Sequence, residues 1–307
     1  MKLLNKTLKK YGLVPSEYRK IGGATIVGSN NGLFVAKEKK HRSNEDIYEY
    51  LSSRNFNYYP RIISAQNDPF EISEYIEEIS MPKEQKMMDM IELVSLLHYK
   101  TTHYKEVDID NYKKIYEDIL NNTDYLYSYY NDIITLIETH VYMSPAEYLL
   151  ARNISKIFGA IEFSKRELES WYELVKNKRK QRFVVLHNNL ELDHFIRNKN
   201  SYLISWDKSK IDNPIFDLYK LYKKHALEFD FESILRAYEK NYPLLEEERK
   251  LLFILISLPE KIVFDDTEYN MCKKISALID TLYKTEALIS PYYSKEKEKH
   301  ANYEKAK

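Results

Sequence analysis

Side chains that can bind metals or move protons gather in the segment between residues 187 and 207. They are His187, Asn189, Asp193, His194, Ser205 and Asp207. Imidazole and carboxylate groups bind zinc and transfer protons near neutral pH. The two histidines alone indicate a metal pair only weakly, because no third carboxylate or cysteine stands in a fixed register with them.

Glycine, which lets backbone N–H groups approach phosphates, is concentrated near the start of the chain. Five of the six glycines fall within the first 32 residues, and only Gly159 follows. A glycine-rich phosphate loop can therefore lie only there, at Gly22, Gly23 and Gly28. The same glycines also suit ordinary hairpin turns, and the hairpin interpretation is favoured.

The composition limits the class of protein. A chain of 307 residues exceeds the size at which single cores stop growing, about 250–300 residues, so we expect two lobes. The 47 Lys plus Arg balance the 47 Asp plus Glu, and no net charge attracts nucleic acid or an anionic membrane. The single Cys272 excludes an internal disulfide, and no apolar run approaches the ~20 residues of a membrane span. We expect a cytoplasmic protein that neither binds nucleic acid nor spans a membrane.

The expected elements are a small sheet followed by a helical lobe. β-type runs span 18–37 and 61–76, and one helix capped by Ser43 lies between them. From Pro82 onward apolar residues recur at helical spacing, and Ser144-Pro145-Ala146-Glu147 predicts the start of a long helix. Short β-type runs interrupt the helices at 183–186, 194–196 and 202–206. This order predicts an α+β fold with a β-rich N-lobe containing one helix (1–80), a mainly α-helical C-lobe (81–290) and a charged tail (291–307).

This order of elements resembles protein-kinase-like folds, and three stretches of the C-lobe strengthen the resemblance. They are His187-Asn188-Asn189 with His194, Leu203-Ile204-Ser205-Trp206-Asp207, and Pro214 with Phe216-Asp217-Leu218. Together they resemble the H-G-D-x-x-x-x-N, I-D-W and F/Y-D-L motifs of the aminoglycoside phosphotransferase and choline kinase superfamily. Trp206 precedes Pro214 by eight residues and Asp217 by eleven, as in that family. Spore-coat-associated kinase-like proteins of low-GC bacteria look like the nearest branch.

The resemblance implies that the family's catalytic positions have changed in this chain, within a loop at 187–196 and a strand at 202–207. The catalytic aspartate falls on Asn189, the metal-binding asparagine on His194 and the metal-binding aspartate on Ser205. An amide accepts no proton at neutral pH, and a serine hydroxyl is a poor ligand for a hard cation such as Mg²⁺. We therefore expect phosphoryl transfer to be absent or very slow.

Three neighbouring residues have other expected roles. Asp193 lies on the same loop, and Asp207 follows the metal position by two residues, so each stays open as a substitute carboxylate. For Asp207 that role would require a strand slip that breaks the spacing from Trp206 to the proline. His187 is expected to shape the loop through hydrogen bonds to backbone carbonyls.

The resemblance also implies a nucleotide site in the N-lobe. Lys37 ends a strand where the family keeps a lysine for the α- and β-phosphates, and Glu49 on the next helix is its expected ion-pair partner. A solvated strand end is an equally weighted interpretation, because Lys37 begins a run of charged residues. Gly22 and Gly23 would approach the phosphates, and the backbone around Tyr75 would contact the adenine ring.

These features favour a catalytically degenerate phosphotransferase, a pseudokinase, that binds a small molecule or a protein in the cleft between its lobes. ATP is the expected cofactor, without a well-formed Mg²⁺ site. Two alternatives stay open. One is an active ATP-dependent kinase for a hydroxyl or amino-alcohol acceptor that uses Asp193 or Asp207, and the other is a structural or assembly protein.

Overall fold

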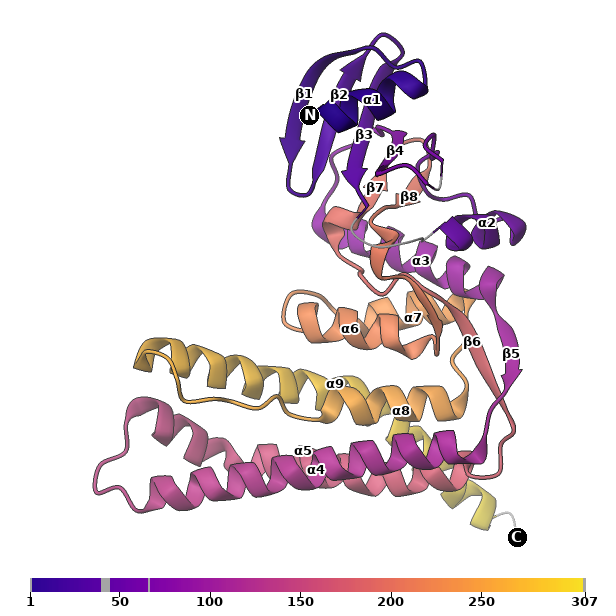
Figure 1. The fold of residues 1–307 in the computed structure, drawn as a ribbon. Coiled ribbons are helices and arrows are strands. Elements are labelled where there is room, and N and C mark those ends of the chain that lie inside the picture. The colour runs from indigo at the N-terminus through magenta and orange to yellow at the C-terminus, as the bar shows by residue number, and fades with distance from the viewer. Residues whose placement is uncertain (1, 40–44, 66, 306–307) are drawn as a thin grey trace. The chain divides into compact units, whose positions relative to one another are not determined.

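The computed structural model describes residues 2–39, 45–65 and 67–305, which divide into two compact units. Unit 1 comprises Met1–Thr102 and Val185–Ile211, and unit 2 comprises His103–Val184 and Asp212–Lys307. The boundary expected near residue 80 follows the change from strand to helix. Unit 1 instead continues through α3 (Lys83–Thr101), because the 185–211 segment packs on that helix. Figure 1 shows the elements of both units.

Unit 1 is built on a four-stranded antiparallel sheet with the order β1-β2-β3-β4. Its strands are β1 (Pro15–Ile21), β2 (Ala24–Ser29), β3 (Gly32–Glu38) and β4 (Phe70–Glu74). The predicted strand at 61–65 is reduced to a single bridge between Ile62 and Ser73. The β-type run at 18–37 therefore forms three strands as expected, and the run at 61–76 contributes only β4.

The prediction of a single N-lobe helix missed α1 (Lys2–Lys10), which precedes α2 (Glu45–Ser53). Leu4 and Leu8 of α1 are one helical turn apart, and they pack with Val27, Phe34 and Ile72 of the sheet in one buried cluster. The expected cap of α2, Ser43, lies outside the described residues. Unit 1 thus buries one face of its sheet under a helix that lacks a recognisable start signal.

The second segment of unit 1 carries short elements. The 3₁₀ turn η1 (Leu192–His194) leads into the hairpin of β7 (Phe195–Arg197) and β8 (Ser201–Leu203). A second 3₁₀ turn, η2 (Trp206–Lys208), follows. The strand expected over 202–207 was too long: it ends at Leu203, because Ser205 adopts a left-handed conformation and Trp206 turns into the core, where it is 1% exposed.

Unit 2 is mainly helical. Two of its long helices, α4 (Ile109–Glu138) and α5 (Pro145–Val175), pack along each other. Helix α5 starts with the predicted capping box between Ser144 and Glu147. The other helices are α6 (Ile215–His225), α7 (Phe231–Asn241), α8 (Glu246–Ser257) and α9 (Glu268–Lys305). Strand β5 (His103–Glu106) and most of β6 (Lys180–Leu186) belong to unit 2, whereas β9 (Lys210–Asp212) lies mainly in unit 1. No helix in the described part of the chain is long and apolar enough to cross a membrane.

The charged tail expected at 291–307 is the continuation of α9, which runs to Lys305. Its last residues are mostly Lys, Glu and Ala, all of which have high helix propensity. Pro291 lies inside the helix and does not end it.

Candidate functional site

The loop that begins at His187 has a backbone shaped by buried side chains. His187 is fully buried, and its Nε2–H donates to the carbonyl of Ile204 at 2.9 Å. Its ring packs edge-to-face against the Trp206 ring, with the ring centroids 4.8 Å apart. The Trp206 indole N–H in turn donates to the carbonyl of Leu203 at 2.9 Å. These contacts hold the loop that begins at His187 and the 203–206 turn together.

Asn188 stands where the family motif has glycine, and it adopts the left-handed conformation that glycine allows. Its φ is 61°, and its side chain amide donates to the carbonyl of Lys208 at 2.7 Å. Asparagine is one of the few residues with a side chain that enters this region readily. The loop therefore keeps the turn of the motif although the glycine is absent.

The motif resemblance assigns the catalytic aspartate position to Asn189, a neutral amide that lies next to a positive charge. The Asn189 side chain Oδ1 accepts a hydrogen bond from Lys208 Nζ at 3.3 Å. His194, which the same resemblance assigns to the metal-binding asparagine position, donates from Nδ1 to the Asn189 carbonyl at 2.7 Å. Neither side chain offers a carboxylate to a substrate hydroxyl or to a metal.

Lys37 lies on β3 and contacts the segment that follows the loop. Its Nζ binds both oxygens of Asp207, at 2.6 and 2.8 Å. The Lys37 side chain is 32% exposed and that of Asp207 57%, so the ion pair is open to solvent. The structure thus brings Asp207 to Lys37 without the strand slip considered from the sequence, because the turn at Ser205 redirects the chain.

A half-buried tyrosine, Tyr48, lies beside this ion pair. Burial, together with the negative charges of Glu71 and Asp207, raises the pKa of the Tyr48 hydroxyl. Glu71 pairs with Lys37 across the β3–β4 ladder, and the Tyr48 ring packs on Tyr59 with centroids 4.9 Å apart. Tyr48 remains a neutral hydroxyl at physiological pH and presents no further charge at the site.

The remaining predicted residues lie in less specific surroundings. Glu49 on α2 and Asp193 in η1 are both exposed. Gly22 and Gly23 form the two-residue turn of the β1–β2 hairpin, with Gly22 at φ 55°. The Tyr75 N–H donates to the carbonyl of Leu33 at 3.1 Å, so this N–H extends the sheet.

Sequence reasoning missed Lys208 and Tyr48 as residues of the site. Lys208 lies two residues after Trp206, and its closeness to Asn189 depends on the η2 turn. Tyr48 immediately precedes Glu49 on α2, and the helical rotation of about 100° per residue separates the two side chains. The only signal for Tyr48 was its apolar neighbours Ile47 and Leu51 on the same helix.

The residues present fit a phosphate group better than they fit Mg²⁺. Lys37 supplies a half-exposed ammonium group of the kind that binds phosphates. At the positions that the motif resemblance assigns to metal binding, His194 and Ser205 offer an imidazole and a hydroxyl, whereas Mg²⁺ prefers carboxylate oxygens. Among the described residues, no three His, Cys, Asp or Glu side chains come together in a way that would hold a metal ion.

No protein-family model matches the chain, and no curated protein sequence does. Solved structures do match. An aminoglycoside phosphotransferase from Alicyclobacillus acidocaldarius superimposes over 95% of both chains with a TM-score of 0.71, at 9% sequence identity. A spectinomycin phosphotransferase crystallised with AMP covers 96% of this chain and 94% of its own, with a TM-score of 0.51 and 15% identity.

These similarities show that the chain has the α+β kinase-like fold of aminoglycoside phosphotransferases. The fold inferred from the motif spacing of the C-lobe is thereby confirmed. At 9 and 15% identity the likeness concerns the fold, and the chemistry has to be argued from the residues themselves.

Proposed function

We propose that this chain is a pseudokinase, a phosphotransferase-like protein that binds a nucleotide through Lys37 and transfers phosphate at or near the background rate. The observation that carries the proposal is the Asn189 amide, held by Lys208 where the fold's catalytic carboxylate is expected. Proton-accepting help is typically worth ~10²–10⁴-fold in rate, and metal neutralisation of the phosphates adds several kcal/mol. The loss of both leaves little of the rate enhancement.

Nucleotide binding is supported by the geometry around β3 and by one structural neighbour. Lys37 ends a strand in a sheet of the expected order, and its ammonium group is solvent-accessible and held by one exposed carboxylate. An exposed ion pair is worth only ~0–1 kcal/mol, so a polyphosphate can displace Asp207 from Lys37. The spectinomycin phosphotransferase of the same fold was crystallised with AMP.

The experiment measures ADP binding by thermal shift and ATP turnover with alcohol and aminoglycoside acceptors. We expect ADP to stabilise the wild-type chain and Lys37→Ala to abolish that stabilisation. Lys20→Ala, an exposed lysine of β1 in the same sheet, is the matched control and should leave it unchanged. Robust turnover by the unmodified protein, lost in Lys37→Ala, would contradict the proposal.

One observation favours a second candidate, an active ATP-dependent kinase that uses Asp207. The Asp207 carboxylate lies 2.6 Å from the Lys37 ammonium, so one anionic group does reach the region where phosphates would bind. In that case Asp207→Asn abolishes turnover and weakens binding of Mg²⁺-ATP. If the chain is a pseudokinase, the same variant binds Mg²⁺-free ATP more tightly, because the competing carboxylate is gone.

A further inference from the structure

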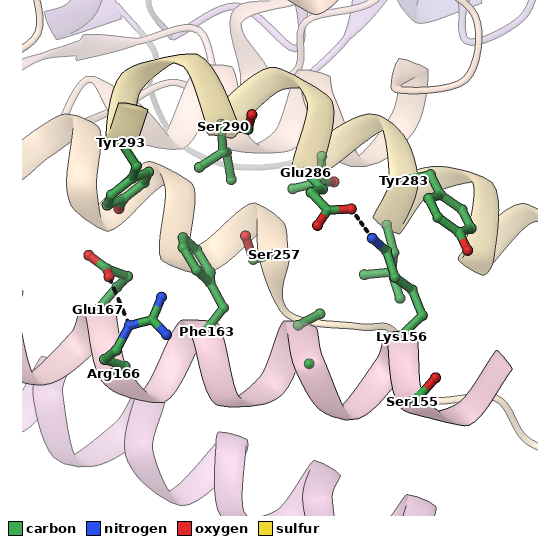
Figure 2. A pocket seen from close by; sticks show the side chains of 15 residues that line it. Ser155, Lys156, Phe163, Arg166, Glu167, Ser257, Tyr283, Glu286, Ser290 and Tyr293 are labelled. Atoms are coloured by element: carbon green, nitrogen blue, oxygen red, sulfur yellow. Dashed lines mark hydrogen bonds and ion pairs between the residues drawn. The ribbon is translucent and has the colours of Figure 1, made fainter. Parts of the chain in front are cut away.

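A pocket of about 850 Å³ lies between α5 and α9, with Ser257 at the end of α8 on its inner side (Figure 2). This volume falls within the ~300–1,000 Å³ typical of small-molecule sites. Every residue that lines it belongs to unit 2. None of the residues considered above for nucleotide binding or phosphoryl transfer contributes to it.

One face of α5 forms a wall of the pocket. Lys156, the adjacent pair Gly159 and Ala160, Phe163 and Arg166 follow one another at intervals of three or four residues, which place side chains on the same side of a helix. Tyr283, Glu286 and Tyr293 of α9 face them across the opening (Figure 2).

Two bridges between the helices mark the ends of the pocket. At one end Lys156 forms an ion pair with Glu286, and its Nζ lies 4.3 Å from the ring centroid of Tyr283. At the other end the rings of Phe163 and Tyr293 meet edge-to-face with centroids 5.5 Å apart. Seven residues separate the two bridges along α5, which corresponds to about 10 Å.

Gly159 keeps the space between these bridges open. A Cβ atom built on it would have no neighbour within 4 Å. Glycine in the middle of a helix is less stable than alanine, and α5 has 31 residues with Gly159 well inside. Together with Ala160, it leaves a gap in the helix face where a larger side chain would pack against α9.

The ion pairs that the described residues form at the Phe163 end occupy Arg166 only in part. Glu167 is 9% exposed and is shared between Lys250, at 2.9 Å, and Arg166, at 3.3 Å. Burial opposes ionisation of Glu167, but its bonds to Lys250, Tyr293 and Arg166 outweigh burial and lower its pKa. One carboxylate thus faces two cations. Arg166, 69% exposed and 5.5 Å from the Phe163 ring centroid, retains guanidinium N–H groups for another anion.

We propose that this pocket binds an amphipathic organic anion, with its acidic group on Arg166 and its aromatic or alkyl body against Phe163 and over Gly159. Leu282 and Ile289 of α9 supply the apolar surface opposite. A planar guanidinium binds a carboxylate, sulfonate or phosphate oxygen pair with two parallel hydrogen bonds. The proposal is independent of nucleotide binding in unit 1.

The first test uses a matched pair of fluorescent probes and the full-length protein. The aromatic sulfonate 8-anilinonaphthalene-1-sulfonate has the proposed chemistry, and N-phenyl-1-naphthylamine has a similar aromatic body without the charge. We expect saturable binding of both. Arg166→Gln should weaken the sulfonate about tenfold or more and leave the neutral probe within twofold, because a charge-assisted hydrogen bond is lost. Arg152→Gln, an exposed arginine of α5 outside the pocket, should change neither.

The second test fills the pocket. Gly159→Leu replaces a poor helix former with a good one, so we expect the protein to fold. The leucine side chain fills the open space, so we expect neither probe to bind. Gly159→Ala should raise the melting temperature and keep binding. Competition with 1-naphthoate and with decanoate then distinguishes an aromatic from an alkyl body, and displacement by either supports the site. Undiminished sulfonate binding in Gly159→Leu, or displacement by neither acid, would overturn the proposal.

Discussion

The residues that shape the catalytic loop and those that would perform its chemistry differ in kind. His187, Asn188 and Trp206 hold the loop in the form that the motif requires, through buried contacts and one left-handed residue. The motif resemblance assigns the chemical positions to Asn189, His194 and Ser205, and none of the three offers a carboxylate. A backbone of this shape is therefore compatible with the loss of the groups that catalysis needs. Variants of the two sets should behave differently, and the predictions below start with the largest expected effect.

Removal of the indole that anchors the loop should have the largest effect. Trp206→Ala leaves a cavity at a side chain that is 1% exposed, and we expect the free energy of unfolding to fall by about 3–5 kcal/mol. Urea denaturation followed by circular dichroism measures this change. A loss below about 1 kcal/mol would mean that the loop is held by other contacts.

Backbone strain at Asn188, the left-handed residue of the loop, should change the free energy of unfolding by less than the loss of the Trp206 indole does. Asn188→Ala and Asn188→Gly both lose the hydrogen bond to the Lys208 carbonyl, but only alanine is strained at a φ of 61°. We expect the alanine variant to be less stable than the glycine variant by about 1–2 kcal/mol, which urea denaturation measures. Equal stabilities would show that the loop relaxes out of this conformation.

The ion pair between β3 and η2 should affect ligand binding more than stability. Asp207→Asn removes the carboxylate that holds Lys37, and we expect up to about fivefold tighter binding of Mg²⁺-free ATP, measured by calorimetry. Asp193→Asn, which removes an exposed carboxylate in η1, is the matched control and should leave the affinity unchanged. Weaker binding in Asp207→Asn would instead support a metal-binding role for Asp207.

Restoration of the catalytic carboxylate alone should change almost nothing. Asn189→Asp forms at most an exposed ion pair with Lys208, so we expect a stability change below about 1 kcal/mol and no detectable turnover. The triple variant Asn189→Asp, His194→Asn and Ser205→Asp is expected to regain ATP hydrolysis, and aspartate tolerates the left-handed backbone at position 205. A coupled assay of ADP release distinguishes the single variant from the triple variant. Turnover by Asn189→Asp alone would contradict the expectation that the three groups act only together.

Local sequence signals predicted part of the fold, and tertiary contacts determined the rest. The capping box at Ser144 and the change of pattern at Pro82 marked the starts of α5 and α3, because each depends on residues within one turn. α1 was missed because it offers only Leu3, Leu4 and Leu8 as apolar residues in nine. Its packing on the sheet stabilises it more than its propensity does.

The site was less predictable than the fold. The motif spacing placed Asn189, His194 and Ser205 in one region of unit 1, yet it gave no indication that Lys37 and Asp207 meet, since 170 residues separate them. That contact depends on the left-handed turn at Ser205, which follows from burial of Trp206 in the core. A single sequence does not encode such a long-range constraint in any local pattern.

Calorimetry of ATP binding to the unmodified protein, with and without Mg²⁺, tests the pseudokinase assignment most directly. The imidazole at 194 and the hydroxyl at 205 leave the ion without its usual carboxylate ligands, so we expect the two dissociation constants to differ by less than tenfold. A gain of tenfold or more with Mg²⁺, about 1.4 kcal/mol, would contradict the assignment and show that a carboxylate such as Asp207 coordinates the ion.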